Sequence, residues 1–156
     1  MRIGEILRYP RIKDPQVELI EGYPNFFNVT HCEHNDIRAQ MESGINPIAD
    51  VKMVDETVKP AIIIRSSPDK VGSKETPWQD VFDVDRGRIR YFGDNKSHET
   101  SPSTKKGNRT LLKYFELYNS KDKDERRKAP PLLFFKTAGK KGLVSFEGVG
   151  VIHKSS

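Results

Sequence analysis

The residues best suited to chemistry lie between Trp78 and Lys96, where aromatic and acidic side chains gather at both ends of one expected strand. The segment reads WQDVFDVDRGRIRYFGDNK, with a turn on Asp85 to Gly87, a strand at 88–92 and then a polar turn. Aromatic faces can sandwich the ring of a nucleobase, and a carboxylate can accept a hydrogen bond from the exocyclic amine of cytosine. The segment therefore predicts a pocket for a base extruded from a duplex.

Basic residues lie on both sides of this segment, in the loops expected at 66–77 and 96–106 and just beyond them. Lys and Arg number 27 against 22 Asp and Glu, so the net charge is +5 and the isoelectric point is about 9.3. This excess favours a polyanionic partner, although a basic protein without such a partner fits the charge too. We expect double-stranded DNA, with its phosphates held by Lys70, Lys74, Lys96, Lys105, Lys106 and Arg109.

The elements that position these residues are expected to be mainly strands. Short runs rich in Val, Ile and Phe are separated by Gly, Pro, Asn or Asp, which is typical of an antiparallel or mixed sheet. The expected strands are 3–7, 17–20, 26–30, 51–54, 61–65, 88–92, 132–137 and 143–153. The predicted fold class is α+β, mainly β, with a few helices on the sheet.

Helical periodicity is clearest after Gly107, where Asn108 can cap a helix. Its apolar face is expected from four residues at helical spacing: Leu111, Leu112, Phe115 and Tyr118. Shorter helices are predicted at 36–41 and 122–128.

Length and composition limit the organisation of the chain. Its 156 residues correspond to a single domain, 1–156, which is too short for a recognition domain plus a full catalytic domain. The single cysteine, Cys32, excludes an internal disulfide and fits a reducing cytoplasm. The N-terminus has no apolar run long enough for a signal peptide or a membrane helix, so we expect a cytoplasmic protein without a membrane partner.

The segment resembles the SRA (SET and RING associated) superfamily. Its members carry an acidic D-x-G turn, an aromatic strand ending in Tyr-x-Gly, a polar or glycine-rich loop, and a helix that opens with Asn and leucines. The corresponding residues here are Asp83, Asp85, Gly87, Tyr91, Phe92, Gly93, Asp94, Asn95, Lys96, Gly107, Asn108, Arg109, Leu111 and Leu112.

A closer resemblance is to the N-terminal recognition domain of AspBHI-type modification-dependent restriction endonucleases. There W-x-D, Y-F-G-D-N-K, G-N-R and an apolar P-L-L-F-F strand occur together, and all four are present here, the last at Pro131 to Phe135. The resemblance covers residues 60–153, and residues 1–59 contribute little to it. Together the motifs are moderately specific, and each alone is weak.

The resemblance implies a curved, barrel-like sheet that reads a flipped base, with 5-methylcytosine as the expected mark. Asp83 would accept from the cytosine amine, Phe92 or Tyr91 would stack on one face, and Trp78 with Asp80 would form the opposite wall. Because Trp78 lies further upstream than the usual tyrosine, Asp80 and Asp83 can exchange roles. The full set of base-binding candidates is Trp78, Asp80, Asp83, Tyr91, Phe92, Asp94 and Asn95. No catalytic residue, metal or cofactor is expected, and cleavage would come from a separate nuclease domain or partner chain.

Two other functions fit parts of the sequence. Asp69, Asp94 and Lys96 imitate the PD-(D/E)xK nuclease pattern, in which carboxylates hold a metal and a lysine assists attack on phosphate. Gly93 is awkward at the end of such a catalytic strand. A reader of phosphorothioate DNA would instead need an apolar dent ringed by cations, for which the candidates are Tyr23, Pro24, Phe26, Phe27, Arg8 and Arg11.

Ordinary packing competes with each functional interpretation. Trp78, Tyr91 and Phe92 can be core residues, although nearby carboxylates make burial without a purpose costly. The cluster from His31 to His34 contains one cysteine and two histidines, but no second ligand pair lies at zinc-site spacing. A surface turn is the favoured interpretation of that cluster.

Overall fold

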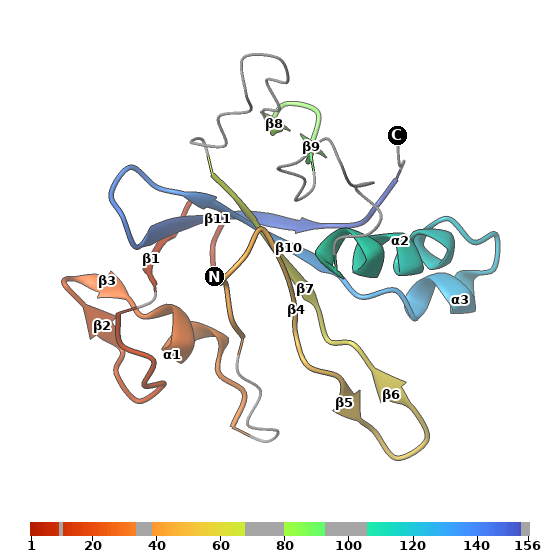
Figure 1. The fold of residues 1–156 in the computed structure, drawn as a ribbon, viewed down its shortest axis with the longest axis horizontal. Helices are drawn as coiled ribbons and strands as arrows, with labels where there is room; N and C mark the ends of the chain where they lie inside the picture. Colours follow the sequence, from red (N-terminus) through yellow and green to blue (C-terminus); the bar gives the residue numbers. More distant parts are fainter. Residues whose placement is uncertain (10, 34–38, 68–79, 93–105, 154–156) are drawn as a thin grey trace.

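The computed structural model describes residues 1–9, 11–33, 39–67, 80–92 and 106–153, and these form short strands with a few helices (Figure 1). The strands are β1 (Ile6–Arg8), β2 (Leu19–Ile20), β3 (Tyr23–Pro24), β4 (Ile45–Pro47), β5 (Val51–Lys52), β6 (Thr57–Val58), β7 (Ile62–Ser66), β8 (Val81–Asp83), β9 (Arg88–Arg90), β10 (Leu132–Thr137) and β11 (Leu143–Gly150). The helices are α1 (Phe26–Thr30), α2 (Lys106–Tyr118) and α3 (Lys123–Arg127). The predicted α+β, mainly β class is confirmed.

The central element is a mixed sheet of five strands in the order β1-β11-β10-β7-β4. β10 pairs with β7 in parallel, and the other neighbours are antiparallel. β1 and β4 are its two edges, so the described strands leave the sheet open and do not close a barrel. Three two-stranded hairpins, β2–β3, β5–β6 and β8–β9, extend from this sheet (Figure 1).

The sheet has an apolar core on each face because successive side chains of a strand point to opposite sides. On one face, Ile63 and Phe135 join a cluster that contains Phe26 and Phe27 of α1. On the other face, a second core, made of Ile45, Ile62, Ile64, Leu132 and Phe134, supports α2 and the β8–β9 hairpin. β7 is therefore buried on both faces, which explains the apolar run from Ile62 to Ile64.

The strand predicted at 26–30 is wrong, because these residues form α1. Asn25 is the helix cap: its side-chain oxygen accepts a hydrogen bond from the Phe27 amide at 3.1 Å. Phe26 and Phe27 are both buried in the same core, which a strand would not allow because its neighbouring side chains point to opposite faces. The strand was predicted from composition alone, because this run is rich in aromatic and β-branched residues.

The helix predicted after Gly107 is confirmed, with two corrections. α2 begins at Lys106, so Asn108 lies inside the helix, where it is buried and does not cap it. Leu112 is exposed, and Tyr114 instead packs on the second core together with Leu111 and Tyr118.

The other helices and strands differ from the predictions mainly in length. α3 matches the helix expected at 122–128, and Asp122 caps it. Of the helix expected at 36–41, residues 36–38 lie outside the described ranges and residues 39–41 are not helical. β9 ends at Arg90, so Tyr91 and Phe92 follow the strand instead of belonging to it. The short strands β3, β4, β6 and β8 were not predicted.

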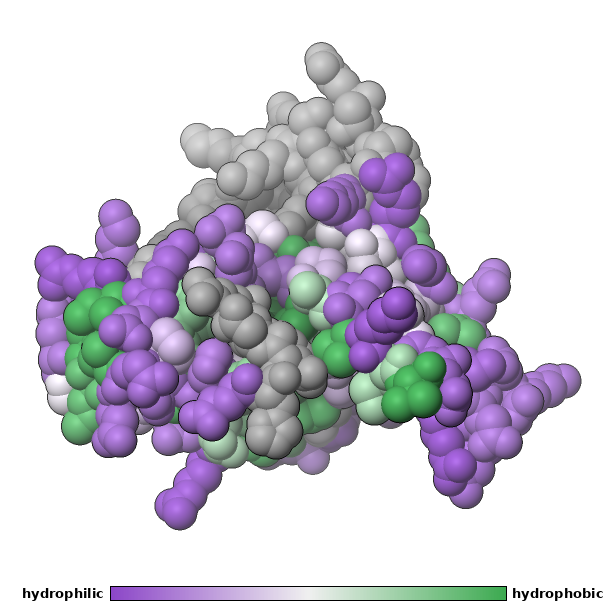
Figure 2. Space-filling view, turned by 90° about the horizontal axis from the view of Figure 1, so that it is seen from below, coloured by the Kyte–Doolittle hydropathy of each residue, from purple (hydrophilic) through white to green (hydrophobic). Residues whose placement is uncertain are grey.

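One face of the described chain is mainly polar. Seen from below, hydrophilic residues dominate and hydrophobic residues form small separate areas (Figure 2). No helix among the described residues is long and apolar enough to cross a membrane.

Candidate functional site

The predicted site falls partly within the described ranges. Asp80, Asp83, Tyr91 and Phe92 are described, all on or beside the β8–β9 hairpin. The residues outside the described ranges are Trp78, Asp94 and Asn95 of the pocket, Lys70, Lys74, Lys96 and Lys105 of the phosphate contacts, and Asp69 of the nuclease pattern. The geometry below therefore concerns the hairpin and the sheet beneath it.

The β8–β9 hairpin has one side toward the sheet and one side away from it. Phe82 pairs with Ile89, both are half-buried, and Ile89 packs against the second core. Asp83 pairs with Arg88, and because side chains alternate along a strand this pair points to the outward side. The turn between the strands places Gly87 at φ 59°, a left-handed conformation that glycine adopts without steric cost.

Asp80 joins the hairpin to the central sheet. Its Oδ2 accepts a hydrogen bond from the Ser66 hydroxyl at 2.6 Å, and its Oδ1 accepts one from the Phe92 amide at 2.9 Å. Ser66 ends β7, while Asp80 and Phe92 flank the two strands of the hairpin. One carboxylate thus holds together the sheet, the start of β8 and the chain after β9, and it brings Asp80 next to Phe92.

Asp83 has a different environment from Asp80. Its Oδ1 accepts from the Arg86 amide and its Oδ2 from the Arg86 guanidinium, both at 3.2 Å. Its side chain is 32% exposed. Asp83 therefore stabilises the hairpin turn from the outward side, and a base amine bound there would share the carboxylate with Arg86.

The two aromatic candidates after β9 are both half-buried. Tyr91 packs against the second core, whereas Phe92 is placed by the bond from its amide to Asp80. Core packing therefore accounts for part of the Tyr91 surface.

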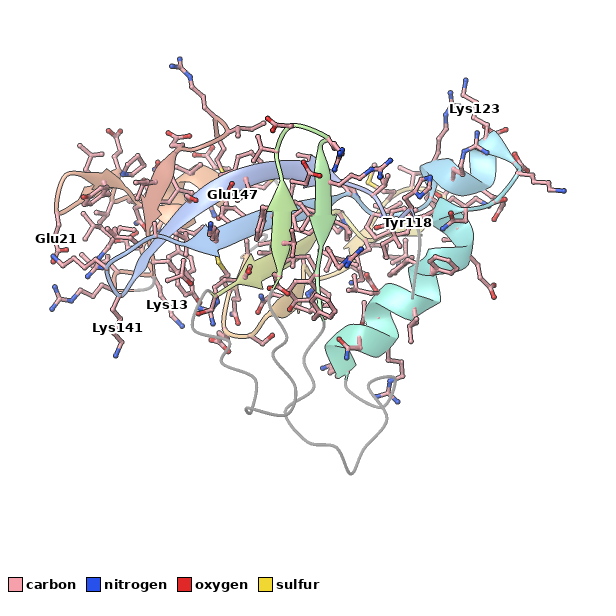
Figure 3. The ribbon with its side chains drawn as sticks, turned by 90° about the horizontal axis from the view of Figure 1, so that it is seen from above. Lys13, Glu21, Tyr118, Lys123, Lys141 and Glu147 are labelled. Atoms are coloured by element: carbon pink, nitrogen blue, oxygen red, sulfur yellow. The ribbon has the colours of Figure 1, made fainter. Side chains whose placement is uncertain are left out.

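A polar row beneath the hairpin was not predicted. Lys136 lies opposite Ser66 on one neighbouring strand and opposite Ser145 on the other, so the three side chains share one face of the sheet. The Lys136 ammonium lies 5.4 Å from the centre of the Phe82 ring. Ser145 donates to Glu147, which lies on β11 beside the hairpin (Figure 3). Only strand register brings these residues together, so the sequence carries no local signal for them.

The described residues do not support a metal site or the phosphorothioate interpretation. Among them no group of three or more His, Cys, Asp or Glu side chains could hold a metal ion, and His34 lies outside the described ranges. Phe26 and Phe27 are buried in the core and do not line an apolar dent. Arg8 and Arg11 both pair with Glu21.

The fold and site together define an α+β domain, built on an open mixed sheet, that presents acidic and aromatic residues on a hairpin. Residues 28–156 match the family model described as "Restriction endonuclease AspBHI N-terminal". The chain therefore belongs to this family of N-terminal domains of AspBHI-type restriction endonucleases. The match begins well before residue 60, so the expectation that residues 1–59 contribute little to the resemblance is wrong.

Solved structures support this assignment. The MspJI restriction endonuclease in complex with a 27-mer oligonucleotide is similar with a TM-score of 0.83 and 34% identity, over 97% of this chain and 36% of that one. The modification-dependent restriction endonuclease AspBHI shares the fold with a TM-score of 0.53 and 20% identity, over 74% of this chain and 27% of that one. This chain thus spans about a third of the length of MspJI. A comparison with curated proteins finds no match.

Proposed function

We propose that the chain binds double-stranded DNA that carries a modified cytosine, with 5-methylcytosine as its mark, and flips that base into the site on the β8–β9 hairpin. The observation that carries the proposal is the double hydrogen bond of Asp80 to Ser66 and Phe92, which holds an aromatic residue beside a carboxylate at the end of β7. The proposed site consists of Trp78, Asp80, Asp83, Tyr91, Phe92, Asp94 and Asn95. Similarity to MspJI, which was solved with an oligonucleotide, supports a DNA partner.

The two carboxylates have separate roles in this proposal. Asp80 positions Phe92 and the hairpin, while Asp83 accepts from the base amine on the outward side. Flipping a base costs a few kcal/mol, which stacking worth roughly 1 to 3 kcal/mol and the hydrogen bonds of the pocket offset. Burying one methyl group contributes only about 0.8 kcal/mol, so strong preference for the mark must come from the shape of the site.

The chain acts as a targeting module in this proposal. A separate nuclease domain or a partner chain cuts the DNA, in the cytoplasm, after this domain has found the modified site. The similarity to restriction endonucleases over about a third of the length of MspJI supports that division of labour.

Binding to one short duplex tests the function. The duplex carries cytosine, 5-methylcytosine, 5-hydroxymethylcytosine or a phosphorothioate, at fixed salt with magnesium, and the products are run on a denaturing gel. We expect tighter binding to a modified cytosine with intact strands. Equal binding to all four would contradict the proposal, and cut strands would instead support the nuclease pattern of Asp69, Asp94 and Lys96.

Variants locate the pocket. We expect Asp83→Ala and Phe92→Ala to abolish the preference for the mark while weak, salt-sensitive DNA binding persists. Asp85→Ala removes a neighbouring exposed carboxylate that has no hydrogen bond among the described residues, and it should leave the preference intact. Equal loss of binding on every DNA for all three variants would remove the support for this pocket.

A further inference from the structure

We propose that the outward side of β9 and the exposed side of α2 form one surface that binds the phosphates of the DNA backbone. We call it the basic band, and it consists of Arg88, Arg90, Lys106, Arg109 and Lys113. The proposal rests on the DNA-binding function above and adds where the backbone lies. Sequence reasoning identified Lys106 and Arg109 only, because Arg88 and Arg90 lie in a strand whose sidedness depends on its pairing.

The hairpin contributes two arginines that pair with no carboxylate among the described residues. Arg88 and Arg90 are two residues apart on β9, so both lie on the side away from Phe82 and Ile89, and both are exposed. Asp83 is the cross-strand partner of Arg88, but both of its oxygens accept from Arg86. Among the described residues, neither Arg88 nor Arg90 forms an ion pair or a side-chain hydrogen bond.

Helix α2 contributes the other cations of the band. Lys106, Arg109 and Lys113 are spaced at i, i+3 and i+7, so they share one side of α2, and all three are exposed. Leu111, Tyr114 and Tyr118 lie on the other side of the helix and pack on the second core. The Lys113 ammonium lies 5.5 Å from the centre of the Tyr114 ring, and no carboxylate among the described residues pairs with any of these three cations.

The two halves of the band are neighbours. Ile89 and Tyr91, within and just after β9, pack against the same apolar cluster as Leu111 and Tyr114 of α2. β9 lies between β8 and α2 in both views of the ribbon (Figures 1 and 3). The apolar sides of β9 and α2 both pack on the same face of the sheet. The charged sides of the two elements therefore both point away from that face.

Several cations elsewhere in the described chain pair with carboxylates. Arg8 and Arg11 pair with Glu21, Lys13 pairs with Glu42, and the end of α3 pairs internally through Arg127 with Asp124 and Lys128 with Glu125. The five cations of the basic band, by contrast, have no ion pair among the described residues. Exposed arginines and lysines that have no carboxylate partner among the described residues fit phosphate oxygens, whose neutralisation releases counterions from the DNA.

The salt dependence of DNA binding by the full 156-residue chain tests the band. We expect the double variant Arg88→Ala with Arg90→Ala to reduce the slope of log K against log[salt] by about 1.8, since each phosphate contact contributes about 0.9. The ratio of affinities for modified and plain duplex should not change, because phosphate contacts carry no base information. As a charge-matched control, Lys140→Ala with Lys141→Ala removes two exposed cations from the β10–β11 turn, at the far end of the sheet from α2 (Figure 3), and should leave the slope unchanged.

The outcomes separate this inference from the function on which it rests. An unchanged slope for the arginine variant, or an equal decrease for the lysine control, overturns the basic band even when the wild-type chain prefers modified DNA. A decreased slope together with equal wild-type binding to modified and plain duplex supports the band and overturns the proposed mark. Thermal melting of each variant should match the wild type because all four side chains are exposed.

Discussion

The hydroxyl of Ser66 donates a hydrogen bond of 2.6 Å to the carboxylate of Asp80, which fastens the β8–β9 hairpin to the end of β7. The same carboxylate accepts a hydrogen bond from the Phe92 amide. The sheet therefore fixes the backbone position of Phe92, one of the two aromatic candidates after β9. A rigid sheet that positions a hairpin in this way is suited to a site that must hold its side chains in place before the ligand arrives.

Removing the Ser66 hydroxyl should loosen the hairpin. Ser66 is buried, and Ser66→Ala leaves one oxygen of the half-buried Asp80 without this donor, so we expect a loss of about 1 to 3 kcal/mol in the free energy of unfolding. Preference for modified DNA should fall as well, since Phe92 loses its fixed position. Ser67→Ala, at the next residue, removes a hydroxyl without a hydrogen bond among the described residues and should have little effect in denaturant titration. Equal stability of the two variants would show that this bond does not hold the hairpin.

Gly107 should be required for the close approach of α2 to the sheet. A Cβ atom at this position would lie 2.8 Å from the Cβ of Ile45 on β4. Alanine normally stabilises a helix by up to about 1 kcal/mol relative to glycine, whereas overpacking a core costs about 1 to 3 kcal/mol, so Gly107→Ala should lower the free energy of unfolding. Thr110→Ala in the same helix lacks this clash and should be neutral or slightly stabilising. A higher melting temperature for Gly107→Ala would contradict the packing argument.

Asn25 should contribute strongly to the stability of the N-terminal part of the chain. It is fully buried, its amide donates to the carbonyl oxygens of Asp14 and Val17 at 2.8 and 2.9 Å, and its oxygen caps α1. We expect Asn25→Ala to cost about 2 to 4 kcal/mol, because it removes the cap and leaves two carbonyl groups unbonded.

The matched comparison is Asn28→Ala, which removes one hydrogen bond, to Pro15, and no cap. Its cost should be about 1 kcal/mol by chemical denaturation. Similar losses for Asn25→Ala and Asn28→Ala would mean that the cap does not stabilise this segment.

Tyr118 should make the fold sensitive to alkaline pH. Its hydroxyl donates to the Pro130 carbonyl, and burial, with a smaller contribution from Tyr114, raises its pKa from 10.0 to about 12. The unfolded chain releases this proton near pH 10 and the folded chain near pH 12, so the contribution is complete below pH 10 and is lost as the pH rises through 12. Tyrosinate absorbance should show one late-titrating group that Tyr118→Phe removes, and titration of all tyrosines together near pH 10 would contradict the prediction.

Local features of the sequence were enough to predict much of the framework. The apolar runs at 61–65 and 132–137 coincide with β7 and β10, and helical spacing from Leu111 to Tyr118 coincides with α2. These predictions succeeded because continuous apolar runs and helical periodicity both reflect burial in the cores on the two faces of the sheet, which acts on each segment separately. The error at 26–30 arose where the cap, Asn25, gains its strength from distant carbonyl groups.

The sequence by itself determined which residue types surround the candidate site, because Asp80, Asp83, Tyr91 and Phe92 lie within one short segment and its motifs mark the family. Only the tertiary structure decided which partners each of these residues has. Asp80 bonds to Ser66 across the fold, while Asp83 closes its own turn, and hairpin pairing turns Arg88 and Arg90 outward. The physical reason is that a carboxylate or guanidinium takes its role from the partners within hydrogen-bonding distance, and pairing and register between distant strands decide which partners those are.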